Sequence, residues 1–123
     1  MTWTEIGLSH LKAAKRTVDT EPRSSASRSY YAIHVVLAEA LNAAGYKFAK
    51  LRQTQPHKDQ KLLIDRYLHG FSQNDLRRLK SAVRQAYRRR LDADYDRRIT
   101  FSKSMALDSL RDVVTVFRIF NIK

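Results

Sequence analysis

The stretch Ala26-Ser-Arg-Ser-Tyr-Tyr-Ala-Ile-His-Val-Val-Leu-Ala-Glu-Ala-Leu-Asn-Ala-Ala-Gly45 decides the fold class. Its apolar side chains recur in steps of four and three, at positions 26, 30, 33, 37, 40 and 44. That spacing is typical of one face of an amphipathic helix. Ser24 or Ser25 is a suitable N-cap, and Gly45 is a suitable residue to end the helix. The stretch therefore predicts a long helix that ends near residue 44.

Four further segments show the same periodicity. They cover about residues 2–18, 58–69, 73–91 and 102–120. The Glu21-Pro22 pair separates the first helix from the second, because proline disfavours helical geometry in the residue before it. Loops are expected over 46–56 and 92–100. Short connections make neighbouring helices antiparallel. The sequence thus predicts a single all-α domain over residues 1–123, an up-and-down bundle of four main helices plus one short helix.

Composition excludes several functional classes. The 123 residues include no cysteine, so a disulfide scaffold, a thiolate metal site and a cysteine nucleophile are ruled out. The four histidines lack metal-ligand spacing, and the acids at 92–96 lack the glycine of a calcium loop. We therefore expect no metal and no cofactor. No segment has the pattern of a targeting or membrane-spanning element, so a cytoplasmic protein without membrane contact is expected.

The charge balance points to a polyanionic partner. Lysine and arginine number 24 against 12 acids, which gives a net charge of +12. Self-repulsion of this kind is relieved by binding nucleic acid. Between residues 76 and 90 the predicted helix holds seven basic residues and no acid. Four of them align on one face and form a predicted RNA-binding stripe: Arg77, Lys80, Arg84 and Arg88. The alternative is a solvated helix face.

Arginine and histidine also occur close together in the sequence. Two pairs stand out, Arg28 with His34 and Arg52 with His57. An arginine and a histidine beside one phosphodiester can cleave RNA without a metal. His34 lies at the edge of the apolar stripe, so a hydrogen-bonded core histidine is the alternative there.

Arg90 continues the apolar series of its helix and is predicted to point inward. An inward guanidinium needs carboxylate or backbone partners, and Asp94 and Tyr95 follow within reach. Either an ion pair at the helix end or a clamp on the scissile phosphate fits this position.

Two elements of the chain resemble the HEPN superfamily. They are Ser27-Arg-Ser-Tyr-Tyr-Ala-Ile-His34 and Arg90-Leu-Asp-Ala-Asp-Tyr95, and the likeness extends over about residues 24–120. The resemblance implies a helical bundle that forms a homodimer with its functional cleft at the dimer interface. Many members of that superfamily are metal-independent endoribonucleases that act as toxins or antiviral effectors, often paired with a nucleotidyltransferase antitoxin.

The expected function is therefore that of an RNA-binding protein with endoribonuclease activity. The candidate catalytic residues are Arg28, His34, His57, Arg90 and Tyr95. The histidines would transfer protons, Arg90 would hold the phosphate, and Tyr95 would bond the phosphate or stack on a base. No histidine follows Arg90 at the distance usual in the superfamily, so a non-catalytic domain that binds a nucleotide or an acidic protein stays open as the alternative.

Overall fold

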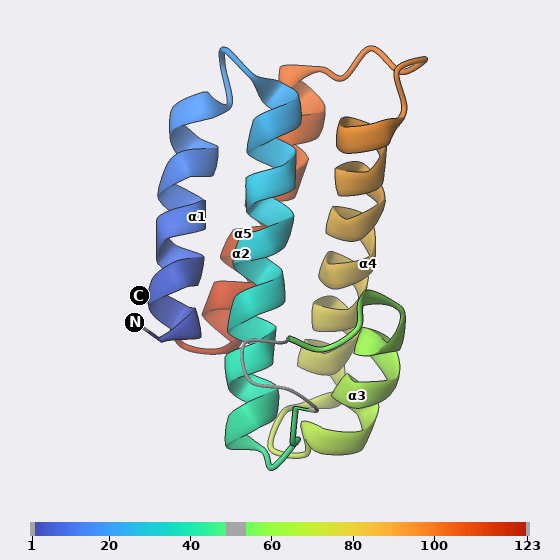
Figure 1. Cartoon of the computed structure of the whole chain (residues 1–123). Helices are drawn as coiled ribbons and strands as arrows, with labels where there is room; N and C mark the ends of the chain where they lie inside the picture. The colour runs from blue at the N-terminus through green and yellow to red at the C-terminus, as the bar shows by residue number, and fades with distance from the viewer. Residues whose placement is uncertain (1, 49–53, 123) are drawn as a thin grey trace.

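The computed structural model describes residues 2–48 and 54–122, and over that range it contains five α-helices, one 3-10 turn and no strand. The elements are α1 (Trp3–Thr17), α2 (Pro22–Ala43), η1 (His57–Asp59), α3 (Gln60–Tyr67), α4 (Gln73–Tyr95) and α5 (Lys103–Ile119). The four long helices run up and down beside one another, and α3 lies against the lower part of α4 (Figure 1). The predicted bundle of four main helices plus one short helix is confirmed.

Helix α2 is the central helix of the bundle. It contacts α1, α4 and α5, and residues 32–38 are buried on every side of the helix. A helix that is apolar all round belongs in the interior. Tyr30, Ile33 and Leu37 lie at the centre of the core, as the stripe predicted, together with Leu79 of α4 and Val113 of α5.

Helix α1 packs close to α2 because it carries a glycine at the contact. A Cβ on Gly7 would lie 2.6 Å from Val36 Cγ1, so the two helices approach closely only without that side chain. Ser25 strengthens the same contact, since its hydroxyl donates to the carbonyl of Ala14 at 2.8 Å.

Two helix boundaries differ from the sequence prediction. Helix α2 begins at Pro22 rather than after a serine cap, because proline suits the first turn of a helix, where no backbone N–H is needed. Helix α4 continues to Tyr95, so the loop predicted over 92–100 begins only at Asp96. Ala93 explains the extension, since it packs into a second apolar cluster with Ala26 and Phe101.

The end of α2 follows the sequence prediction. Gly45 has a φ of 102°, and the Tyr46 amide donates to the carbonyl of Leu41 at 2.9 Å. This is the hydrogen bond of a Schellman motif, which needs a residue in the left-handed region.

Candidate RNA-binding groove

A basic groove runs between α4 and the η1–α3 segment. Its volume is about 440 Å³. Its apolar lining residues are Ile64, Val83 and Tyr87, of which Tyr87 is the one that is partly exposed. Five cationic side chains also line it, and none of its described lining residues is acidic: Lys58, Lys61, Arg77, Lys80 and Arg84. The groove thus combines positive charge with an apolar surface, as single-stranded nucleic-acid sites do.

The predicted stripe on α4 contributes three of its four residues to this groove. Arg77 and Arg84 are exposed and form no ion pair within the described part of the chain. Lys80 Nζ lies 2.7 Å from Asp65 Oδ1 of α3. Arg88 is exposed but does not line the groove.

Lys58 and Lys61 also line the groove, although the sequence analysis did not identify them. They stand one helical turn apart on η1 and α3, immediately after His57. A pair of lysines at that spacing is a signal that the sequence contains, but only the fold shows that it faces the arginines of α4.

His34 lies beneath the groove as a buried anchor for the segment that forms one of its walls. It is 3% exposed, and hydrogen bonds connect it to side chains of residues 54–60. Its Nε2 lies 2.7 Å from Thr54 Oγ1, and its Nδ1 lies 2.8 Å from Gln60 Oε1. A neutral His34 with its proton on Nδ1 donates to Gln60 and accepts from Thr54, which satisfies both nitrogens. Burial lowers its pKa to about 4.

The hydrogen bonds around Gln60 determine how His57 is protonated. Gln60 Nε2 donates to Tyr30 Oη at 3.0 Å, so the Tyr30 hydroxyl directs its own proton to His57 Nδ1. Burial, and then the charge of Arg90, lower the pKa of His57 below its ordinary value. His57 is therefore neutral at pH 7 with its proton on Nε2, and it presents a hydrogen-bond donor.

Stacking fixes the plane of the His57 ring. The ring stacks on His34 at 4.5 Å and on Tyr87 at 5.5 Å between centroids. His57 also lines the basic groove. Of the candidate catalytic residues, it is the one that the described structure places in this groove.

Arg90 is held by partners on both sides. Its Nη2 donates to Tyr31 Oη at 2.9 Å, and its Nε lies 3.1 Å from Asp94 Oδ2 without being aligned for a hydrogen bond. The guanidinium carbon lies 5.4 Å from the ring centres of both Tyr31 and Tyr95. The Arg90 side chain is 13% exposed, whereas Tyr95 is 72% exposed. The inward direction predicted for Arg90, and its contacts with Asp94 and Tyr95, are confirmed.

Of the two arginine–histidine pairs from the sequence, only Arg28 with His34 falls within the described residues, and that pair does not form. Arg28 Nη1 donates to His10 Nδ1 at 3.2 Å rather than approaching the buried His34. Two residues that are six positions apart on a helix point in directions about 120° apart, so Arg28 and His34 lie on different faces of α2. Arg52 lies outside the described residues. The cluster that the fold does assemble is Tyr30, Tyr31, His34, His57 and Arg90.

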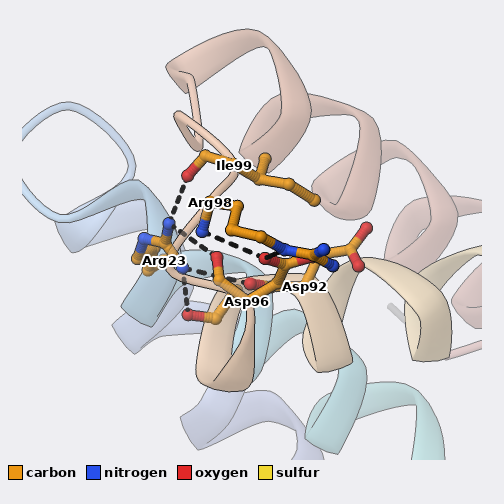
Figure 2. Close-up of polar contacts among 6 residues, drawn as sticks. Arg23, Asp92, Asp96, Arg98 and Ile99 are labelled. Carbon is orange, nitrogen blue, oxygen red and sulfur yellow. Dashed lines mark hydrogen bonds and ion pairs between the residues drawn. The ribbon is translucent and has the colours of Figure 1, made fainter.

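Arg23 binds the backbone at the end of α4, and the sequence analysis did not identify it. Figure 2 shows its guanidinium directed at the end of that helix. It donates to four backbone carbonyls, those of Asp92, Ala93, Asp96 and Ile99. The last carbonyls of a helix lack an intrahelical partner, although the carbonyl of Asp92 also accepts from the Asp96 amide. Arg23 thus fixes the end of the helix that carries Arg90 and Asp94.

The described residues lack two features, a metal-binding cluster and a membrane-spanning helix. No group of three or more histidine, cysteine, aspartate or glutamate side chains is arranged to hold a metal ion within residues 2–48 and 54–122. No helix in the same ranges combines the length and apolarity needed to cross a bilayer. Comparisons with family models, with curated proteins and with solved structures find no match to this chain.

Proposed function

We propose that the protein binds RNA in the groove between α4 and the η1–α3 segment. The carrying observation is that five cations face this groove and none of its described lining residues is acidic. Phosphate oxygens satisfy such cations, and the release of counterions drives the association. The partly exposed ring of Tyr87 supports contact with an unpaired base.

His57 supports binding through the same groove. Its Nε2–H is a donor at neutral pH, which suits an acceptor oxygen of a phosphate or a ribose. A general base needs an unprotonated nitrogen, and Nδ1 is already occupied by the Tyr30 hydroxyl. This hydrogen-bond pattern favours a binding role for His57 over proton abstraction.

Ribonuclease activity stays a prediction. The proximity of His57 and Arg90 to Tyr31 favours it, because the Tyr31 ring centre lies 6.5 Å from that of His57 and its hydroxyl accepts from Arg90. Incubation with total RNA checks it: cleavage that disappears in both His57→Gln and Arg90→Lys, with the unfolding midpoint of each variant unchanged, would establish catalysis. Cleavage that persists in both would remove these residues from the reaction.

The proposed RNA binding is tested by reversing charge in the groove. The variant Arg77→Glu/Arg84→Glu should weaken binding of a fluorescein-labelled single-stranded RNA at least about tenfold. The slope of log affinity against log salt should fall by about 0.7 for each phosphate that the variant no longer binds. Both side chains are exposed, so circular dichroism should show an unchanged fold.

The matched control is Lys12→Glu/Arg118→Glu, which changes the net charge equally at exposed positions of α1 and α5 that form no ion pair among the described residues. Equal losses of RNA affinity in the groove variant and the control would show that only net charge matters and would overturn the proposal.

The resemblance leads to further predictions that stay untested. They are homodimer formation, a toxin or antiviral role, and a nucleotide or a nucleotidyltransferase antitoxin as ligand. Isolation of one acidic protein in place of RNA would select the acidic-partner alternative.

A further inference from the structure

Beyond Tyr31, away from the basic groove, the surface has a second polar hollow. Its volume is about 440 Å³, and it lies between α2 and the end of α4. Ser24, Ser27, Arg28, Tyr31 and Asp94 line it. Its one described acid, Asp94, is already paired with Arg90, so it does not repel an anion as a free carboxylate would.

Arg28 connects this hollow with a smaller one between α1 and α2. The smaller hollow has a volume of about 260 Å³ and is lined by Ser9, His10, Arg16 and Arg28. Arg28 and Arg16 are exposed, and neither forms an ion pair among the residues that the structure describes. Two guanidinium groups and the hydroxyls of Ser9 and Ser24 therefore face solvent here, whereas the Ser27 hydroxyl donates to Asp94. That is the chemistry that binds phosphate.

His10 makes the site responsive to an anion. Arg28 Nη1 donates to His10 Nδ1, so this nitrogen carries no proton. Burial, and then the neighbouring Arg28 charge, lower the pKa of His10. An anion bound beside Arg28 would offset that charge and raise the pKa of His10 again.

Tyr31 lies between the two hollows on one side and the basic groove on the other. Its ring centre is 6.1 Å from that of His10 and 6.5 Å from that of His57, which lines the groove. Along α4, the path from Arg77 to Asp94 covers about 25 Å at the rise of an α-helix. A strand several nucleotides long can therefore contact both ends.

We propose that an RNA strand bound in the basic groove continues across Tyr31 to a second phosphate-binding surface formed by Arg28, Arg16 and the hydroxyl of Ser24. The inference rests on the proposed RNA binding and adds a separate site to it. It gives Arg28 a role in binding the backbone of the strand, apart from any part in cleavage.

The test compares two lengths of labelled single-stranded RNA, about four and about twelve nucleotides. The variant Arg16→Glu/Arg28→Glu should weaken binding of the longer RNA about tenfold and lower its salt slope. Binding of the shorter RNA, which the basic groove accommodates alone, should change by less than about twofold. Lys12→Glu, at an exposed position of α1 outside both hollows, is the control and should affect neither RNA.

A second measurement reports on the site directly. Titration of His10 by NMR should show its pKa rising when the longer RNA is present and staying constant with the shorter one. Equal effects of Arg16→Glu/Arg28→Glu on both lengths, or no effect on either, would overturn the second site. Binding that is insensitive to Arg77→Glu/Arg84→Glu would instead remove the groove itself, so the two failures are distinguishable.

Discussion

The two halves of α4 are both rich in arginine, but the arginines of each half have different surroundings. The first half carries Arg77 and Arg84, which face the groove without an acidic partner in the described structure. The second half carries Arg89, paired with Asp112 of α5, and Arg90, held by Asp94 and Tyr31. The first set of charges is available to a ligand, and the second stabilises the fold.

The difference arises from what lies opposite each half. The first half faces η1 and α3, which bring two further lysines and one carboxylate, that of Asp65 on Lys80, so positive charge remains in excess there. The second half faces α2 and α5, which bring a tyrosine hydroxyl and a carboxylate. An arginine-rich helix therefore does not by itself define a binding surface. The neighbouring elements decide which cations remain exposed and which become structural.

The largest expected effect is at the end of the structural half. Arg23→Met keeps the length and the apolar stem of the side chain but removes the guanidinium that donates to four carbonyls. Hydrogen bonds from a charged donor are worth about 1.5–3 kcal/mol each, so the free energy of unfolding should fall by at least about 3 kcal/mol. Urea denaturation followed by circular dichroism measures it. Arg97→Met, at an exposed neighbouring position, is the control, and a loss of equal size there would contradict the assignment.

The next effect is the dependence of stability on pH that His34 causes. The pKa of His34 is about 4 in the folded chain and about 6.5 when unfolded, so the unfolded chain binds more protons between these values. The contribution of His34 to stability is complete above pH 6.5. It is lost as pH falls toward 4, at a cost of about 3 kcal/mol.

Measuring the free energy of unfolding of the parent and of His34→Gln as a function of pH isolates the contribution of His34. His10 and His57 also have lowered pKa values, and both remain in the variant. The free energy of unfolding of the variant should therefore depend less on pH between 4 and 6.5 than that of the parent. Identical pH profiles would show that His34 is not held neutral by the fold.

A smaller effect is expected at the contact of α4 with α5. Arg89→Gln leaves the carboxylate of Asp112 half-buried without its partner. Burial already raises the pKa of Asp112, so the loss of the guanidinium should destabilise the charged form further. We expect the free energy of unfolding at pH 7 to fall by about 1–2 kcal/mol. Recovery in Arg89→Gln/Asp112→Asn would confirm the pair, and an additive loss would contradict it.

The fold could be predicted from the sequence because its signals are local. The four-three spacing around Tyr30 and Leu37 requires no knowledge of distant residues, and these side chains lie in the core as predicted. The predicted start of α2 is wrong because it considered Ser24 and Ser25 as N-caps without regard to Pro22, which begins the helix. Pro22 serves equally well in the first turn, which leaves Ser25 free to bond α1.

The site could be predicted only in part because its contacts join distant segments. The inward direction of Arg90 follows from its place in the apolar series of α4. The role of Arg23 does not, since its four acceptors lie about seventy residues away and are backbone atoms. The pairing of Arg28 with His34 failed for the same reason, because proximity in sequence took no account of which faces of α2 meet α1 and η1.

The most direct test of the account compares one arginine from each half of α4. Arg84→Gln and Arg89→Gln remove the same charge from the same helix. Arg84→Gln should weaken single-stranded RNA binding several-fold, lower the salt slope by about 0.7 and leave the unfolding midpoint unchanged. Arg89→Gln should lower the unfolding midpoint and leave the RNA affinity of the folded protein within about twofold of the parent. Equal losses of RNA affinity in the two variants would contradict the division of α4 into a binding half and a structural half.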